Sequence, residues 1–173
     1  MKIERVVVGE LDTNCYILTQ DNKCLVVDPG AEYAKINEHL IGKEVLGILL
    51  THHHFDHVGA LKEVLENYNT KVYDFNNLKE QNYMIGPFSF SVIDNPGHTD
   101  DSISFYFKEV KVMFVGDFVF LNSIGRCDLD GGSFIKMKDS ISKLIKMEND
   151  ITLYPGHGLK TTLNYEKKHN SFF

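Results

Sequence analysis

Four residues able to bind a metal ion lie in one short segment, directly after the apolar run of residues 45–50. The segment reads THHHFDH, and its candidate ligands are His52, His54, Asp56 and His57. Because alternate side chains at the end of a strand point to the same side, His52 and His54 are predicted to converge, whereas His53 points away. The other two candidates come just before a predicted helix and face a different point. This one segment therefore predicts ligands for two metal ions.

Three more ligand-type side chains follow other predicted strands, each at a turn that contains glycine. They are His98 after residues 88–94, Asp117 after residues 111–115 and His157 after residues 151–154. Active sites of α/β proteins commonly assemble at the carboxyl ends of strands. One tetrahedral zinc with an open position needs about three protein ligands, so these seven side chains predict two ions. Imidazole and carboxylate suit zinc, iron or manganese, and an Asp117 that bridges the pair would hold the ions about 3.5–4 Å apart.

The order of these motifs resembles the metallo-β-lactamase-fold hydrolase superfamily, and within it the small glyoxalase II-like members. The matching stretches are the HxHxDH motif, NCYIL at 14–18, VDPG at 27–30, GDFVF at 116–120, SIGRCDL at 123–129 and YPGHG at 154–158. The resemblance implies an α/β protein with a four-layer αββα sandwich, built as a single domain over residues 1–173. It implies one metal held by His52, His54 and His98, a second held by Asp56, His57 and His157, and Asp117 between them. Zinc is the expected metal, with iron and manganese as alternatives.

Three departures from the family narrow the expected activity. The two-zinc members that destroy penicillins usually place a cysteine where this chain has Asp117, so β-lactamase activity is not expected. The members that process nucleic acids carry large insertions, for which 173 residues leave no room. Glyoxalase II itself appends a helical domain that grips glutathione, whereas only 16 residues follow His157 here. The resemblance therefore does not extend to glutathione specificity.

Composition and charge limit the kind of partner. The chain is 43% hydrophobic over 173 residues, which is enough for one sizeable core. Its formal net charge is −6 and it has no block of Lys or Arg, so binding to nucleic acid is not expected. Two bound divalent ions would still attract an anionic small molecule. We therefore expect a small-molecule substrate, and the sequence carries no signal for the oligomeric state.

The cysteines indicate a reducing compartment. Three widely spaced cysteines and no signal peptide or apolar run of membrane length predict a cytoplasmic protein with free thiols and no membrane association. Cys15 and Cys24 lie in predicted strands and are expected to be buried, whereas Cys127 is expected near the site.

Hydrophobic periodicity predicts two halves of similar organisation, each with strands followed by helices. The predicted strands are residues 3–8, 14–19, 24–28, 45–50, 88–94, 102–107, 111–115 and 151–154, and the predicted helices are residues 32–40, 59–68, 133–146 and 163–169. This order fits two sheets packed face to face with helices outside.

Several residues near the ligands have competing interpretations. Asp28 is either a turn carboxylate or a hydrogen-bond partner of a ligand imidazole. Arg126 is expected to pair with Asp128 rather than bind a substrate anion, and Tyr154 to pack in its strand rather than contact substrate. Loop residues that we expect to be solvated are Thr51, Thr99, Asp100 and Asp101, and histidines expected to take no part are His39, His53 and His169.

The predicted chemistry is hydrolysis by metal-activated water. Paired divalent ions lower the pKa of a bound water from 15.7 toward about 7, and Asp56 is the candidate catalytic residue that orients this water and takes its proton. No Gly-x-Ser-x-Gly motif offers a serine nucleophile. The leading hypothesis is a thioester hydrolase of glyoxalase II type. Alternatives are an iron-dependent persulfide dioxygenase, then a lactonase, then a metal-stabilised scaffold without hydrolytic activity.

Overall fold

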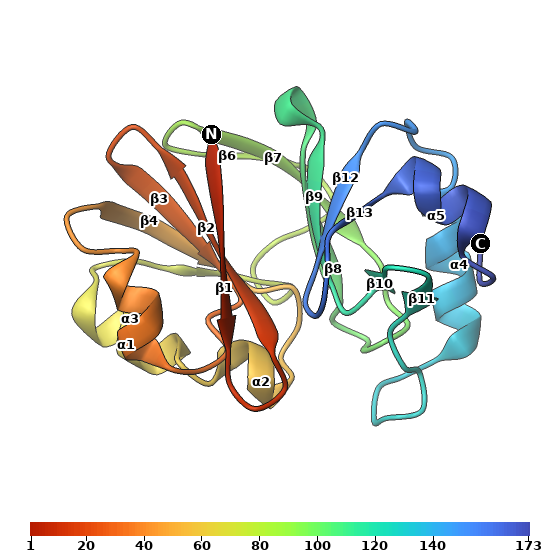
Figure 1. Ribbon diagram of the computed structural model, residues 1–173, viewed down its shortest axis with the longest axis horizontal. Helices are drawn as coiled ribbons and strands as arrows, with labels where there is room; N and C mark the ends of the chain where they lie inside the picture. The colour runs from red at the N-terminus through yellow and green to blue at the C-terminus, as the bar shows by residue number, and fades with distance from the viewer.

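Two mixed β-sheets form the centre of the computed structural model, which describes residues 1–173 (Figure 1). The first sheet has the strand order β1-β2-β3-β4-β5. Its strands are β1 (Lys2–Val8), β2 (Thr13–Gln20), β3 (Lys23–Val27), β4 (Glu44–Leu49) and β5 (Val72–Tyr73). The first three strands are antiparallel neighbours, and β4 and β5 then run parallel to β3.

The second sheet has the order β13-β12-β9-β8-β7-β6. Its strands are β6 (Asn82–Ile85), β7 (Phe88–Asp94), β8 (Ile103–Phe107), β9 (Val112–Gly116), β12 (Thr152–Pro155) and β13 (Thr161–Thr162). Its one parallel pair is β9 with β12. A separate hairpin joins β10 (Val119–Phe120) to β11 (Ser123–Ile124).

Helices cover the outer face of each sheet (Figure 1). The helices of the chain are α1 (Tyr33–Glu38), α2 (Phe55–Val58), α3 (Leu61–Asn67), the 3-10 helix η1 (Lys108–Val110), α4 (Phe134–Leu144) and α5 (Leu163–His169). α1 and α3 lie on the first sheet, whereas α4 and α5 lie on the second. The Ser133 and Thr162 side chains cap α4 and α5 by accepting backbone N–H bonds. α4 is the longest helix at 11 residues, and no helix of the structure could cross a membrane.

Three apolar clusters fill the three interfaces between the four layers. The largest, with 14 buried residues, lies between the sheets and includes Tyr16 and Leu18 of β2. Cys15 and Ile17 of the same strand belong to the cluster under α1 and α3. β2 thus buries both faces, because its alternate side chains enter different cores. The third cluster lies under α4 and α5. The predicted four-layer αββα sandwich is confirmed.

The predicted helix over residues 59–68 is wrong in its boundaries. Helical structure begins at Phe55, so two predicted ligands lie inside α2 rather than before a helix. α3 then begins separately at Leu61. The break lies where the chain packs tightly on a neighbouring turn: a Cβ at Gly59 would come within 2.2 Å of the Gly30 carbonyl oxygen. The short strands β5, β6, β10, β11 and β13 were not predicted.

Candidate metal centre

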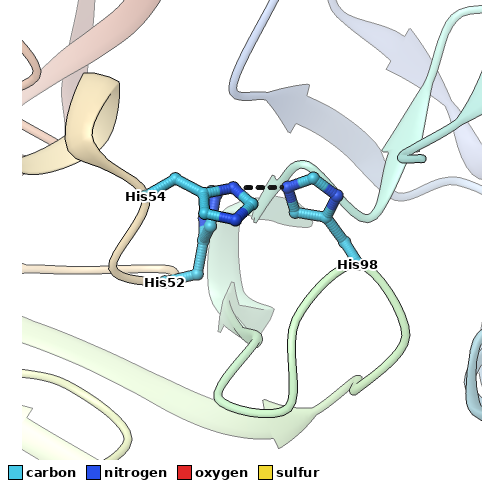
Figure 2. Close-up of side chains that lie close together, drawn as sticks. All are labelled: His52, His54 and His98. Atoms are coloured by element: carbon cyan, nitrogen blue, oxygen red, sulfur yellow. Dashed lines mark hydrogen bonds between the residues drawn. The ribbon is translucent and has the colours of Figure 1, made fainter. Parts of the chain in front are cut away.

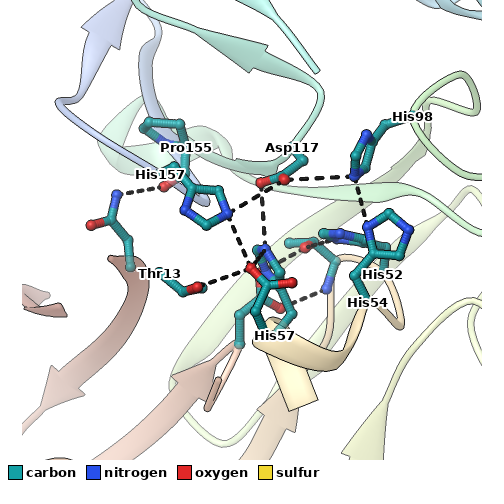
Figure 3. Close-up of polar contacts among 12 residues, drawn as sticks. Thr13, His52, His54, His57, His98, Asp117, Pro155 and His157 are labelled. Atoms are coloured by element: carbon teal, nitrogen blue, oxygen red, sulfur yellow. Dashed lines mark hydrogen bonds and ion pairs between the residues drawn. The ribbon is translucent and has the colours of Figure 1, made fainter. Parts of the chain in front are cut away.

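All seven predicted ligands converge at one edge of the two sheets (Figure 3). Because β9 and β12 are parallel neighbours, their carboxyl ends lie side by side and bring Asp117 close to His157. The His157 Nε2 atom is 3.5 Å from Asp117 Oδ2. The loop after β7 in the same sheet supplies His98, and the segment after β4 supplies the other four from the facing sheet. The site therefore joins both sheets.

Three imidazoles form the first cluster (Figure 2): His52, His54 and His98. Nε2 of His98 lies 2.9 Å from Nδ1 of His54. The ring centroid of His52 lies 4.8 Å from the ring centroid of His54 and 5.0 Å from that of His98. Their ligand atoms all lie within 4.8 Å of one another. Three nitrogen donors around one point fit a single tetrahedral metal with one open position.

A carboxylate and two imidazoles form the second cluster: Asp56, His57 and His157. Oδ2 of Asp56 lies 3.2 Å from Nε2 of His157 and 3.5 Å from Nε2 of His57. The same oxygen accepts a hydrogen bond from the Thr13 hydroxyl at 3.0 Å. The threonine orients the carboxylate toward the two imidazoles.

Asp117 lies between the two clusters. Its Oδ1 is 3.4 Å from His57 Nε2, and its Oδ2 is 3.5 Å from His98 Nε2. The carboxylate therefore faces one imidazole from each cluster. Space for this arrangement depends on Gly156, since a Cβ there would lie 2.3 Å from Asp117 Oδ1 and 2.6 Å from a ring carbon of His57.

Oxygen atoms behind the centre hold three of the imidazoles by their Nδ1 atoms. Asp28 Oδ2 lies 3.0 Å from Nδ1 of His57, and the carbonyl oxygens of Leu11 and Arg126 lie 2.9 Å and 2.8 Å from Nδ1 of His157 and His98. An imidazole that donates from Nδ1 keeps the lone pair of Nε2 for a metal. The three rings are thus held in the tautomer that a ligand needs.

The innermost donor atoms have no partner in the protein. Nε2 of His52, Nε2 of His57 and Oδ1 of Asp117 are buried without a hydrogen bond. A buried polar atom left unpaired costs about 1–3 kcal/mol, and a metal ion contacting these atoms would remove that cost. The residues present therefore fit a dinuclear metal centre.

The two clusters differ in how their surroundings shift the pKa of the imidazoles. Burial disfavours charge on His57, yet Asp117 and Asp28 raise its pKa to about 10. Burial also opposes charge on His157, whose pKa is raised to about 10 by Asp117 and Asp56. In the first cluster burial and the neighbouring imidazoles lower the pKa of His52 and His54. Protons therefore compete with metal ions chiefly at the second cluster.

A comparison with known protein families agrees with this geometry. The Metallo-beta-lactamase superfamily matches residues 8–80 and 73–157. The chain belongs to this superfamily.

Two curated relatives match the chain over almost its whole length. A probable metallo-hydrolase, YqgX of Bacillus subtilis (strain 168), is 35% identical over 99% of this chain and 97% of its own length. A hydroxyacylglutathione hydrolase, GloC of Haemophilus influenzae (strain ATCC 51907 / DSM 11121 / KW20 / Rd), is 30% identical over 99% of this chain and 98% of its own length.

Three solved structures of the superfamily are similar to the fold. The BLEG-1 B3 metallo-β-lactamase has a TM-score of 0.95 at 30% identity and covers 99% of both chains. TTHA1623 in a di-iron-bound form has a TM-score of 0.89 at 30% identity, covering 98% of this chain and 100% of its own. ETHE1 from Myxococcus xanthus has a TM-score of 0.90 at 25% identity, covering 99% and 84%. The identity of the metal is open.

Predictions about other residues of this superfamily member had mixed outcomes. The expected Arg126–Asp128 pair forms, with a distance of 2.8 Å from Arg126 Nη2 to Asp128 Oδ2. Tyr154 packs against Phe114 in the core, as expected of a strand residue. Thr51 and Thr99, both expected to be solvated, are instead buried.

The contacts and burial of the remaining side chains test the predictions made for them. Asp28 is the expected partner of a ligand imidazole, and it also accepts bonds from the Thr51 amide and hydroxyl. Cys15 and Cys24 are fully buried as predicted. His53 points away from the centre as predicted, but it contacts Asp101 and Asp74 rather than solvent alone.

Residues that support the ligands from distant segments were missed. Thr13 reaches Asp56 across 43 residues of sequence, and Asn14 donates from Nδ2 to the carbonyl oxygens of Pro155 and Gly158 at 2.9 Å and 3.0 Å. Such partners leave no local pattern. A threonine and an asparagine at a strand start look like ordinary turn residues.

Proposed function

We propose that the protein is a metal-dependent hydrolase of glyoxalase II type, which cleaves a thioester such as S-lactoylglutathione or a related ester. The observation that carries the proposal is the place of Asp117, whose two oxygens face imidazoles of both clusters. A shared carboxylate is what a two-metal hydrolytic site needs. The similarity to GloC supports the choice of a thioester.

The proposed ligand sets follow the two clusters. One metal would be held by His52, His54 and His98 and the other by Asp56, His57 and His157, and Asp117 would supply a carboxylate to both. When bound, a pair of divalent ions supplies an activated water at neutral pH and polarises the carbonyl group under attack. Zinc is our first choice, with iron and manganese as alternatives.

The catalytic work of the chain itself falls to Asp56. Thr13 holds one carboxylate oxygen of Asp56 at 3.0 Å, so the group is fixed in one orientation. In this position Asp56 orients the attacking water and accepts its proton. The water oxygen bonds to the carbonyl carbon, the carbon–sulfur bond breaks, and the proton passes to the departing thiolate. The products are a carboxylic acid and a thiol.

A persulfide dioxygenase is the second candidate, because by family resemblance enzymes with that activity share this ligand list while using a single iron. The ligand set by itself therefore favours neither activity. The similarity to GloC, which is named a hydroxyacylglutathione hydrolase, supports the choice of the hydrolase.

An activity panel on protein loaded separately with zinc, iron and manganese tests the proposal. The substrates are S-lactoylglutathione, a simple thioester, a lactone, a β-lactam and glutathione persulfide. We expect thioester cleavage without oxygen uptake and two metal ions per chain. Oxygen uptake with the persulfide, together with one iron per chain, would support the dioxygenase instead. Cleavage of only the β-lactam, as the name of BLEG-1 suggests for that protein, would also contradict the proposal.

A further inference from the structure

A groove of about 310 Å³ lies beside the loop that carries His157. Its walls come from both sheets and from the residues after this ligand: Ile3, Arg5, Tyr16, Tyr154, Leu159 and Lys160. Ile3 belongs to β1 and Tyr154 to β12, so the groove crosses the seam between the sheets. None of these residues belongs to the proposed metal ligands.

The groove is tied directly to the metal centre. Arg5 donates from Nη1 to the carbonyl oxygen of Gly158, the residue next to His157, at 2.8 Å. Leu159 follows His157 by two residues, so their Cα atoms lie no more than about 7 Å apart. The groove therefore begins within one loop of the proposed metal ligands.

Two cationic side chains border the groove, and neither forms an ion pair with a carboxylate. Arg5 uses a guanidinium N–H on Gly158 and keeps its other donors free. Lys160 Nζ lies 5.7 Å from the centre of the Tyr154 ring and forms no hydrogen bond or ion pair within the chain. By contrast, the other arginine, Arg126, is held by two bonds to Asp128. In a chain of net charge −6, this pair of free cations is a local attraction for an anion.

The remaining walls suit a flexible and partly apolar chain. Besides the two cations, the groove is lined by Ile3, Leu159, Tyr154 and the largely buried Tyr16. Methylene groups pack on apolar surfaces, while a terminal carboxylate can accept two parallel N–H hydrogen bonds from a guanidinium. The groove thus fits an extended chain that ends in a carboxylate.

We propose that this groove binds the thiol portion of the substrate, and that Arg5 and Lys160 select a thiol carrier bearing a carboxylate. The inference rests on the proposed thioesterase function and adds to it the chemical class of the leaving thiol.

The test compares S-lactoylglutathione with the same thioester after both carboxylates are converted to amides, using the metal-loaded protein. The two substrates share the acyl group and the reacting bond. We expect kcat/KM to be higher for the acid form, and Arg5→Gln and Lys160→Gln each to lower it about three- to tenfold, mainly through KM. Both variants should lower kcat/KM more for the acid form than for the amide form, so the ratio between the two should fall. The preference should shrink as salt rises, because exposed charges are screened.

Two control variants separate charge from structure. Arg5→Lys keeps the charge and a donor for Gly158, and it should retain most of the preference for the acid form. Lys62→Gln removes an exposed cation on α3 and should change kcat/KM for neither substrate. Equal wild-type rates on both forms, or an equal loss on both forms in the Arg5 and Lys160 variants, would overturn the inference.

Two further measurements keep the outcomes distinct. A coenzyme A thioester offers phosphate as the anion, and a stronger dependence of its cleavage on Arg5 and Lys160 would overturn the choice of a carboxylate. If the wild type cleaves neither thioester, the proposed function fails. In that case calorimetry compares the affinity of the protein for S-methylglutathione with its affinity for the diamide of the same compound. Tighter binding of the acid supports the proposed role of the groove, and equal binding overturns it.

Discussion

The two ligand clusters differ in charge, although both take ligands from the two sheets. The first is made only of imidazoles, whereas the second contains a carboxylate, Asp56, and an imidazole, His57, that is backed by a second carboxylate, Asp28. Each cluster combines two residues of the segment after β4 with one residue that follows a strand of the second sheet, His98 after β7 or His157 after β12. Both clusters therefore form only when the two halves of the molecule are packed together.

A single network nevertheless supports both clusters. Asp28 contacts His57 directly and accepts a hydrogen bond from the Thr51 hydroxyl at 2.7 Å. The same hydroxyl lies 3.1 Å from Nδ1 of His52. The two ligand clusters thus share one buried anchor, and Asp117 contacts an imidazole of each.

Removing the shared ligand should have the largest effect. Asp117→Ala is expected to empty both sites and to lower kcat/KM by about a thousandfold or more, because metal catalysis supplies several kcal/mol of transition-state stabilisation. His52→Ala should deplete chiefly the first site. Elemental analysis after dialysis measures the difference. A full equivalent of tightly bound metal in Asp117→Ala would show that the two clusters are independent.

Asp56→Asn should lower kcat by about 10²- to 10⁴-fold, the usual range for loss of a general base. The amide oxygen can still accept the Thr13 hydrogen bond, so the melting temperature should change little. Thr13→Val is the matched control, since it removes the orienting bond and leaves the carboxylate. A loss of turnover in Thr13→Val as large as that in Asp56→Asn would mean that orientation, not proton transfer, is the essential property.

The shared anchor offers a way to separate the clusters. Asp28→Asn should weaken metal binding about 10- to 100-fold, mostly at the second cluster, because it alters the partner of His57. Thr51→Val should weaken metal binding mostly at the first cluster, since it removes the hydroxyl group next to His52. Competition with a chromophoric chelator gives both affinities. Identical effects of the two substitutions would mean that the network acts as one unit.

The sequence predicted the ligands better than their supports. His52, His54, Asp56 and His57 lie in one motif at a strand end, where residue spacing alone indicates convergence. The boundary of α2 was missed because the break at Gly59 is imposed by contact with Gly30, a residue distant in sequence.

Supporting contacts were missed for the same reason. The Asn14–Pro155 bond spans 141 residues, and the contact of His53 with Asp74 depends on β5 lying beside β4. Neither contact can be found from periodicity, because each exists only after the sheets have formed.

The smallest expected effect concerns the histidine between the ligands. His53 contacts the carboxylates of Asp101 and Asp74, and thereby links the first ligand segment to the loop after His98 and to the end of β5. His53→Ala should cost about 1 kcal/mol of stability, which corresponds to a fall of about 2–4 °C in melting temperature.

Catalysis should be almost unaffected by this change, since the ring of His53 points away from both clusters. We expect two metal ions per chain and kcat/KM within about twofold of wild type. Asp101→Asn is the matched control, because the amide keeps an oxygen near the ring and removes only the charge, so its stability loss should be smaller. Loss of a metal ion in His53→Ala, combined with full activity in Asp56→Asn, would contradict the ligand assignment. The comparison of the two clusters depends on that assignment, in which His53 points away from the centre and Asp56 is a ligand.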